Sequence, residues 1–294
     1  MPLLVRLPNV DNAGFPQFLN VLDRNKTAVQ RALRRSGLGG YEPEFLSSIL
    51  ALGEAQKRDF VFYDVGAHIG LYAALAAKLF GANCHAFEPT PETCKDCRSL
   101  MRENQLIYAV TQVAVSDQPG GELDLFISPK AETSNSLNAE FRPGSEPIKI
   151  KVLSLDSYTE KGAPDPTIVK IDVETHEPAV IIGALKMIAR AKPILACEFL
   201  PKVNIAQLAT ALASLDRLGY KFLHMRPETP WEAKSIPEVA GDLRHNGRDW
   251  LLVPEELPAN FYERREAWKA ALSKCGADTN LLVPARNKNK RALA

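Results

Sequence analysis

The sequence predicts an α/β fold in which a mostly parallel sheet is covered by helices on both faces. From residue 59 onward, short apolar stretches alternate with segments of helical periodicity, which is the pattern of successive βαβ units. The strand segments are mostly apolar, as expected where helices cover both faces of a sheet. With 294 residues, the chain suits one large domain with a terminal extension.

The elements of this domain are assigned in order along the chain. Strands are expected at residues 59–64, 84–87, 109–115, 168–171, 194–199, 221–224 and 250–253, and helices at 71–80, 91–105, 178–189 and 206–218. Pro91 and Pro178 begin their helices, because proline suits the first helical turn. Gly219 ends the last of these helices, where a left-handed residue is common. Between the third and fourth strands, apolar residues at every second position in 123–127 and 148–152 predict an inserted β excursion.

The segments on either side of this domain have different patterns. Phe15, Phe18, Leu19 and Leu22 are spaced as on a helix, and Pro43 begins a second helical segment that ends before residue 56. The C-terminal residues 286–291 are basic and lack apolar periodicity. We therefore divide the chain into a helical N-terminal extension at 1–57, the α/β domain at 58–256, and a C-terminal helix with a basic tail at 257–294.

The composition favours a soluble cytoplasmic protein without a dedicated nucleic-acid surface. The 36 basic and 35 acidic side chains give a formal charge of +1, which is too balanced for an electrostatic footprint on nucleic acid. The five cysteines are odd in number and show no paired metal spacing, which argues against a disulfide framework and fits a reducing compartment. No secretory signal begins the sequence, and no apolar run reaches the roughly 20 residues that span a bilayer.

The segment from Asp64 to Gly70 is the first candidate binding site. Gly66 and Gly70 stand where the first strand turns into the first helix, and glycine permits a ligand to approach the backbone closely. Glu88 ends the next strand, at a separation typical of an acid that binds the ribose hydroxyls of an adenosine. Asp64 would repel a pyrophosphate and attract an ammonium group, so the turn favours S-adenosylmethionine over NAD. The alternative is a tight turn and a strand-ending acid that bind no ligand.

Two further strand ends carry acidic residues. Asp117 follows the third strand, where a carboxylate can accept a hydrogen bond from the adenine amine, although an Asp before Pro-Gly-Gly is also an ordinary turn residue. The fourth strand ends at the sheet edge where ligands bind in such folds. If it continues, Asp172, Glu174 and His176 share one face and can hold a cation; if it ends at Asp172, Glu177 instead caps the following helix. Because nothing else has metal-ligand spacing, we predict no metal site.

These motifs, in this order, resemble the FkbM family of methyltransferases. The resemblance covers roughly residues 60 to 255 and rests on residues 64–70, 87–89, 113–117, 134–137, 155–156, 170–174 and 249–254. It implies a class I methyltransferase (Rossmann-like) fold, which is a three-layer sandwich with a mostly parallel seven-stranded sheet. It also implies methyl transfer from S-adenosylmethionine, most often to a hydroxyl of a sugar, glycan or natural product.

The resemblance also implies roles for single residues. Cofactor contacts are expected for Asp64, Gly66, His68, Gly70, Glu88, Asp117 and Asp172. Asp172 would in addition lie near the methyl group. The sequence departs from the family where His68 replaces the usual Asn and where Thr175 and His176 replace Gly-Ala. The second departure adjoins the expected acceptor.

Methyl transfer to a hydroxyl needs a group that removes a proton. A histidine titrates near neutral pH, and His176 has Asp172 and Glu177 beside it. We therefore predict these three as the catalytic residues, with His176 as the general base, the alternative being a solvent-facing His176. The expected partner is a small-molecule or glycan acceptor, recognised by the N-terminal helices, by residues 134–147 or by the polar loop 226–248.

Two other functions stay open from the sequence. One is an N- or C-methyltransferase, although no Asn-Pro-Pro-Tyr-like motif follows the fourth strand. The other is a non-catalytic or partner-dependent protein that binds S-adenosylmethionine, because a fold alone does not prove turnover. The oligomeric state is open as well, and a homo-oligomer is compatible with the sequence.

Overall fold

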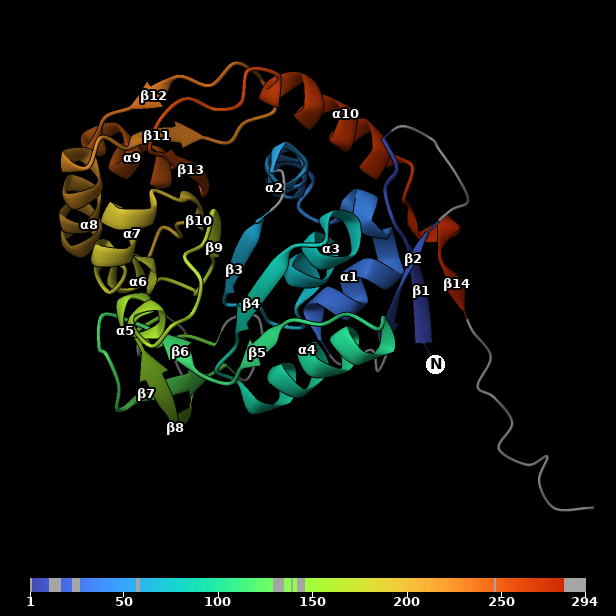
Figure 1. Ribbon diagram of the computed structural model, residues 1–294, viewed down its shortest axis with the longest axis horizontal. Coiled ribbons are helices and arrows are strands. Elements are labelled where there is room, and N and C mark those ends of the chain that lie inside the picture. Colours follow the sequence, from blue (N-terminus) through green and yellow to red (C-terminus); the bar gives the residue numbers. More distant parts are fainter. Residues whose placement is uncertain are drawn as a thin grey trace, which may run out of the picture.

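A computed structural model describes residues 2–10, 17–22, 27–56, 59–128, 135–138, 140–141, 146–245 and 247–282. Within these ranges the chain forms three layers, with a central sheet between two groups of helices (Figure 1). The strand order of this sheet is β12 (Ala233–Lys234), β11 (Lys221–His224), β13 (Asp249–Val253), β10 (Ile194–Glu198), β9 (Ile168–Ile171), β3 (Val61–Val65), β4 (Asn83–Phe87) and β5 (Ala109–Thr111). Strands β10, β9, β3, β4 and β5 run parallel, whereas the pairs that involve β11 and β13 are antiparallel. The predicted α/β fold with a mostly parallel sheet is confirmed.

The described sheet has 8 strands, whereas the sequence predicts seven. The additional strand is β12, whose Ala233 and Lys234 pair with Leu223 and Phe222 of β11 because the chain turns back along the sheet edge. This strand and helix α9 (Ile236–Leu243) occupy the segment 226–248, which the sequence assigns to a polar loop.

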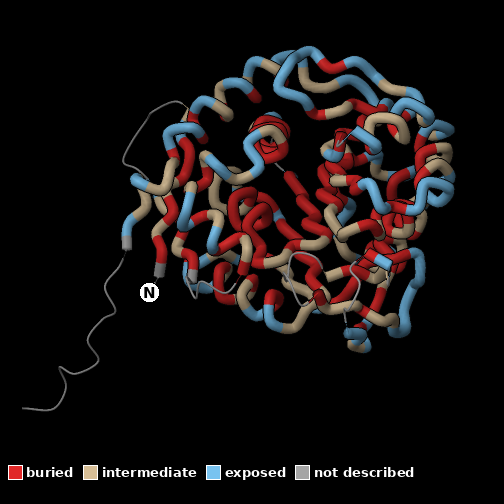
Figure 2. The backbone as a smooth tube through the Cα atoms, turned by 180° about the vertical axis from the view of Figure 1, so that it is seen from behind, coloured by how far each residue is buried: buried red, intermediate tan, exposed pale blue. Residues whose placement is uncertain are grey.

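Helices cover both faces of the sheet. One layer contains α1 (Ala28–Ser36), α2 (Pro43–Ala55), α3 (Leu71–Phe80), α4 (Pro91–Glu103) and α10 (Phe261–Ser273), and the other contains α5 (Leu155–Glu160), α6 (Glu177–Ile182), α7 (Leu185–Ala191), α8 (Ile205–Arg217) and α9 (Figure 1). The central strands and the helix faces toward them are buried, whereas the outer helix faces are exposed (Figure 2).

Alternation along the strands divides the core into two halves. Phe62 and Ile168 belong to the cluster under the α3 layer, and Tyr63 and Val169 belong to the cluster on the opposite face. Successive side chains of a strand point to opposite faces. The next residues in the first series are Asp64 and Lys170, so two charged side chains point from neighbouring strands into the α3 layer.

The N-terminal extension is not entirely helical. Residues Phe18–Leu22 form strand β2, which pairs with β1 (Pro2–Arg6), and β1 pairs with β14 (Leu281–Leu282). The predicted helix is wrong here, because Leu19 and Val21 are buried in alternation with half-buried neighbours, as in a strand. Helix α2 begins at Pro43 as predicted, after the short 3₁₀ helix η1 (Leu38–Gly40). Phe15 and residues 286–291 lie outside the described residues, and the domain boundaries stay predictions.

Two predicted elements are interrupted. The strand expected at 109–115 divides into β5 and β6 (Ala114–Val115), and β6 leaves the main sheet to pair with β8 (Glu146–Leu153). Strand β8 also pairs with β7 (Glu122–Ile127), which confirms the predicted β excursion. The helix expected at 178–189 divides into α6 and α7 around Gly183, where a Cβ atom would lie 2.1 Å from the carbonyl oxygen of Ser116.

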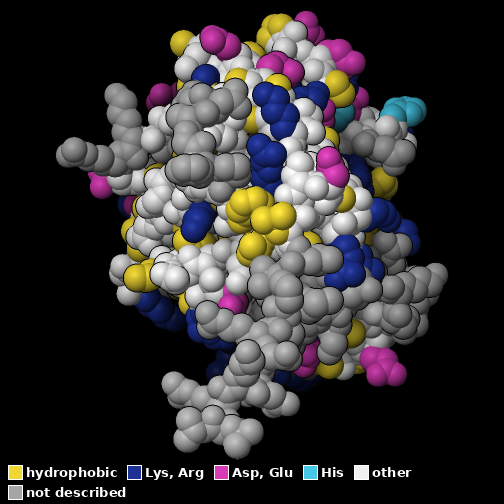
Figure 3. Space-filling view, turned by 90° about the vertical axis from the view of Figure 1, so that its right-hand side faces the viewer, with side chains coloured by type: hydrophobic (Ala, Val, Ile, Leu, Met, Phe, Trp, Pro, Cys, Tyr) yellow, Lys and Arg dark blue, Asp and Glu magenta, His cyan; other side chains and the backbone are white. Residues whose placement is uncertain are grey.

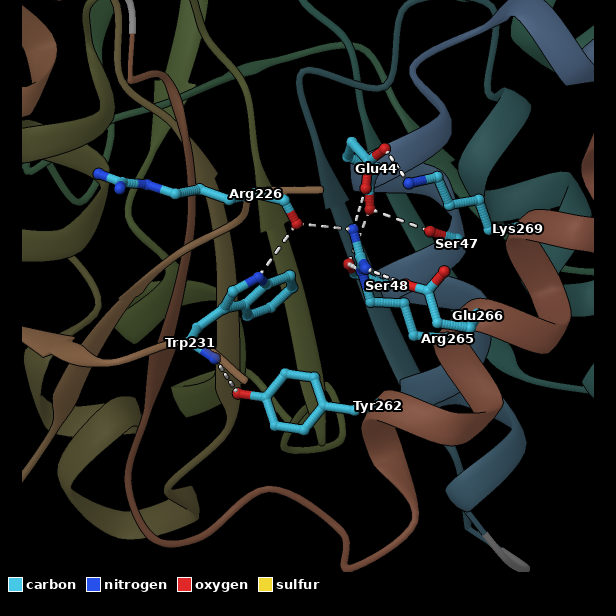
Figure 4. A network of polar contacts seen from close by, with 9 residues as sticks. All are labelled: Glu44, Ser47, Ser48, Arg226, Trp231, Tyr262, Arg265, Glu266 and Lys269. Carbon is cyan, nitrogen blue, oxygen red and sulfur yellow. Dashed lines mark hydrogen bonds and ion pairs between the residues drawn. The ribbon is translucent and has the colours of Figure 1, made fainter. Parts of the chain in front are cut away.

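A buried arginine joins the N-terminal extension to the C-terminal helix. Arg265 of α10 is 0% exposed and forms an ion pair with Glu44 of α2 (Figure 4). Its guanidinium also donates to the hydroxyl of Ser48 at 3.2 Å and to the carbonyl of Arg226 at 3.0 Å. It lies 4.8 Å above the ring centre of Trp231. The contacts satisfy the buried charge and hold α2, α10 and the chain after β11 together.

The surface carries mixed charge. On the face drawn in Figure 3, Lys and Arg side chains lie at several separate places, with acidic and apolar side chains between them. In the described part of the chain, no helix is long and apolar enough to cross a membrane.

Candidate active site

A cavity of about 700 Å³ lies at the carboxyl ends of the parallel strands. Its wall consists of residues that follow β3, β4, β9 and β10, together with residues of α1 and of the segment before α2. Ligands bind at this edge in doubly wound α/β folds. The volume falls within the roughly 300–1,000 Å³ of sites that bury a small molecule.

The turn between β3 and α3 brings backbone to the cavity wall. Gly66 has a φ of +76°, and a Cβ atom there would lie 1.8 Å from the carbonyl oxygen of Asp172. The N–H groups of Gly66 and Ala67 both donate to the carbonyl of Phe87 at 3.0 Å. Only glycine fits this close approach, so the predicted role of Gly66 agrees with its place in the cavity wall.

Two predicted cofactor contacts in the same turn, Asp64 and Gly70, do not line the cavity. Asp64 is fully buried, and its Oδ2 atom accepts a hydrogen bond from the N–H of Ala73 in α3 at 3.0 Å. Gly70 packs against α4, since a Cβ atom there would lie 2.5 Å from the sulfur of Cys97. The structure places both residues where they shape the turn, and their contact with a cofactor stays a prediction.

Glu88 lines the cavity at the end of β4 and is 6% exposed. Its Oε2 atom accepts from the N–H of His68 at 2.8 Å, and its Oε1 atom accepts from the N–H of Thr90 and the hydroxyl of Thr93, both at 2.8 Å. A carboxylate has about four acceptor positions. These three contacts fix the orientation of the carboxylate and leave capacity for a further donor. His68 also lines the cavity.

Lys170 is a site residue that the sequence analysis did not single out. Its Nζ atom donates to the carbonyl of Gly66 at 2.9 Å and lies 3.2 Å from Asp172 and 3.6 Å from Asp64. The side chain lines the cavity and is buried. Burial alone would lower the pKa of Lys170, but the carboxylates of Asp172 and Asp64 outweigh it and raise the pKa. The available signal was a lysine within an otherwise apolar strand, since lysine is almost never buried unless paired.

His176 lines the cavity, and it also lies next to the residue that follows β6. Its Nε2 atom lies 2.9 Å from the hydroxyl of Ser116, which donates to Asp117 at 3.0 Å. With this hydroxyl donating to Asp117, the Nε2 of a neutral His176 carries its proton and Nδ1 does not. Burial lowers the pKa of His176, and Asp117 opposes this shift. Asp117 itself does not line the cavity, so its contact with adenine stays a prediction.

Glu177 bonds to the backbone of the preceding turn. Its Oε1 atom accepts from the N–H groups of Val173 and Thr175, both at 3.1 Å, and burial raises the pKa of Glu177 to about 8. It does not line the cavity, and its catalytic role stays a prediction. Strand β9 ends at Ile171, so the continued strand that a shared cation-binding face requires does not form. Among the described residues, no group of three or more His, Cys, Asp or Glu has metal-binding geometry.

The opposite half of the cavity contains further charged residues. Glu198, at the end of β10, lies 3.4 Å from Arg248. Lys202 follows β10 and donates to the carbonyl of Phe141 at 3.2 Å. Glu42 before α2 lies near Glu198, and Arg35 of α1 also lines the cavity. The sequence analysis did not name any of these residues as site residues, because they are distant from one another along the chain.

Of the three segments expected to recognise an acceptor, two line the cavity. The N-terminal extension contributes α1 and the residues before α2, and the segment 134–147 contributes Asn135, Ser136, Leu137 and Phe141. Asn135 donates to the hydroxyl of Thr90 at 3.2 Å, and Ser136 donates to the carbonyl of Glu174 at 2.5 Å. Ser134 lies outside the described residues. The third segment, 226–248, contributes only its last residue, Arg248, to the described lining of the cavity. Its Trp231 packs against Arg265 instead.

The parallel sheet, the glycine turn after β3 and the buried acid at the end of β4, arranged around one cavity, define a Rossmann-like α/β protein with a cavity at the sheet edge where ligands bind in such folds. The chain belongs to the FkbM methyltransferase family, since the family described as "Methyltransferase FkbM domain" matches residues 64–222, more than half of its length. The resemblance predicted from the motifs is thereby confirmed.

Individual proteins are similar to this chain at lower coverage. The hexuronic acid methyltransferase AglP of Haloferax volcanii is 33% identical over 135 residues, which are 46% of this chain and 53% of AglP. The chain therefore matches about half the length of this curated relative. The solved methyltransferase FkbM from Methylobacillus flagellatus KT has a TM-score of 0.40 and 15% identity, covering 70% of this chain and 47% of its own. A precorrin-6y C5,15-methyltransferase from Geobacter metallireducens GS-15 has a TM-score of 0.37 and 13% identity, covering 71% and 85%.

Proposed function

We propose that the protein transfers a methyl group from S-adenosylmethionine to an oxygen atom of a sugar or glycan that contains a hexuronic acid. The observation that carries this proposal is the buried carboxylate of Glu88, which lines the cavity beside the glycine turn at Gly66. Family membership supports methyl transfer, and the similarity to a hexuronic acid methyltransferase supports a uronic acid acceptor.

The half of the cavity around β3 and β4 suits the methyl donor. Glu88 is oriented by three hydrogen bonds and can accept one more from a ribose hydroxyl. The backbone at Gly66 permits close approach, and the carboxylate of Asp172 favours a positively charged ligand. When bound, S-adenosylmethionine supplies a methyl carbon that its sulfonium charge activates for displacement.

The half of the cavity around β10 suits an acidic sugar. Lys202 and Arg248 bring two cationic side chains to its wall, with Arg248 paired to Glu198, and Arg35 adds a third cation to the lining of the cavity. A guanidinium or ammonium group binds a carboxylate through charge-assisted hydrogen bonds. These residues would hold the uronic acid carboxylate, while the protein positions an oxygen of the sugar in line with the methyl carbon.

We further infer a cytoplasmic location for this activity. All five cysteines are free and buried. A reducing compartment keeps thiols in this state.

Isothermal titration calorimetry tests the proposed donor site. The native protein is expected to bind S-adenosylmethionine and S-adenosylhomocysteine with micromolar affinity, and Glu88→Ala is expected to weaken both by about 100-fold because a charged hydrogen-bond acceptor is lost. Glu92→Ala is the matched control, since it removes a carboxylate that is 79% exposed on α4. Binding of NAD in place of both ligands, or equal affinity in the native and Glu88→Ala proteins, would contradict the proposal.

A further inference from the structure

Methyl transfer to a sugar hydroxyl needs a base at the acceptor side of the cavity. We propose that Glu198 is this base and that its carboxylate takes the proton of the acceptor hydroxyl. The inference rests on the proposed function and adds a catalytic residue from β10, a strand that the sequence analysis did not connect with catalysis.

Three titratable side chains that line the cavity, Glu88, Asp172 and His176, are engaged in other contacts. The carboxylate of Glu88 is held by three hydrogen bonds beside the donor half. Asp172 is engaged in an ion pair with the buried ammonium of Lys170, at 3.2 Å. His176 is bonded to Ser116 next to β6, a strand that belongs to the separate three-stranded sheet β6-β8-β7.

Glu198 differs from these groups in position and in partners. Cys197 of β10 is in register with Ile171 of β9, so Glu198 and Asp172 are the next residues of two adjacent parallel strands. The side chain lines the cavity and is 21% exposed, and its ion-pair partner is Arg248 at 3.4 Å. This distance is longer than the roughly 2.7–2.9 Å of a charge-assisted hydrogen bond. Glu198 therefore lies beside the predicted methyl-transfer position with a carboxylate that can still accept a proton.

The charges around Glu198 favour its protonated form. The ionised carboxylate is therefore a stronger base than an ordinary glutamate. The groups that face it from neighbouring elements are Asp172, Glu174, Arg248, Asp249 and Glu42. Burial, followed by the negative charge of Asp172, raises the pKa of Glu198 to about 10, and Arg248 opposes this shift. Because the reactive form is the carboxylate, the transfer rate is expected to rise with pH between about pH 7 and pH 9.

The proposed step balances in atoms and charge. The acceptor O–H bond breaks, its proton goes to a carboxylate oxygen of Glu198, and the oxygen electron pair forms the new O–CH₃ bond. The electron pair of the broken S–CH₃ bond goes to the sulfonium sulfur, which leaves a neutral thioether. Glu198 returns the proton to water when the product leaves.

The test uses the full chain with S-adenosylmethionine labelled in the methyl group and two acceptors, a methyl glycoside of glucuronic acid and the matching glycoside of glucose. Glu198→Gln keeps the shape of the side chain and removes its basicity. We expect a fall in kcat of about 100-fold or more, a threefold or smaller change in S-adenosylhomocysteine affinity and acceptor KM, and loss of the rise with pH. Glu92→Gln is the matched control, because Glu92 is a carboxylate on α4 that is 79% exposed and does not line the cavity.

Each other outcome is decisive. If the native protein transfers methyl groups and Glu198→Gln stays within fivefold of it, the role of Glu198 is refuted while the proposed function stands. A large fall in kcat in His176→Ala, with little change in Glu198→Gln, would identify His176 as the base. A product that mild alkali hydrolyses is a methyl ester. Because the acceptor carboxylate carries no proton, this product would refute the need for a general base. If the native protein binds S-adenosylhomocysteine but methylates neither sugar, both the proposed acceptor class and the role of Glu198 are overturned.

Discussion

Replacement of Arg265 by methionine is expected to lower the free energy of unfolding by about 3 kcal/mol. Methionine preserves most of the volume of the side chain and removes its charge. The change leaves Glu44 without its buried partner and leaves the hydroxyl of Ser48 and the carbonyl of Arg226 without this donor. Removing one member of a buried ion pair costs about 3–5 kcal/mol.

The structure places the expected loss at the lower end of that range. Glu44 is 22% exposed and keeps a second ion pair with Lys269, so part of its charge stays compensated. The expected total of about 3 kcal/mol includes about 1 kcal/mol from the lost cation–π contact with Trp231. Arg264→Met is the matched control on the same helix, because Arg264 and its partner Glu54 are 26% and 29% exposed. The control is expected to lose about 1 kcal/mol or less.

Urea unfolding followed by circular dichroism measures both variants. With a denaturant slope of about 3 kcal/mol per molar, the midpoint of Arg265→Met is expected to fall by about 1 M and that of Arg264→Met by about 0.3 M. In the pair Glu44→Gln and Arg265→Met, the double variant is expected to lose less than the sum of the single losses. Equal losses in Arg265→Met and Arg264→Met would refute the argument that burial decides the cost.

Two further predictions concern the site. Gly66→Ala is expected to weaken S-adenosylhomocysteine binding by about 100-fold in calorimetry, because its Cβ atom would collide with the carbonyl of Asp172. The control Gly81→Ala has a similar φ of +66° and no atom within 4 Å, and it is expected to cost only about 1 kcal/mol of stability. Equal ligand affinities in the two variants would contradict this prediction. Glu177 has a raised pKa of about 8 in the fold, so its contribution to stability is full below about pH 4.5 and falls as the pH rises toward 8. Glu177→Gln is expected to remove this decline, about 1.4 kcal/mol for each unit by which the pKa is raised, in urea unfolding at several pH values, and parallel stability curves would count against it.

The half of the cavity around β3 and β4 was predictable because its signals are local. The turn at Gly66 needs a residue without a Cβ atom, and an acid at the end of the next strand is brought to the same edge by a single βαβ unit. The β excursion and the α/β alternation follow from side-chain periodicity, which a strand or helix expresses within a few residues. Family membership, inferred from the order of these motifs, was confirmed.

The half of the cavity around β10 and the partners of the buried charges depend on contacts between segments that are far apart in the chain. Arg35, Glu198 and Arg248 meet at one cavity only because β10 lies between β9 and β13 and because α1 reaches the same sheet edge. His176 follows Asp172 closely in sequence, yet the left-handed turn at Glu174 and Thr175 directs it to Ser116. Local periodicity also failed for Phe18–Leu22, where pairing with β1 outweighs helical spacing. A sequence records which residues are neighbours along the chain, whereas sheet order and turn conformation decide which of them share a cavity.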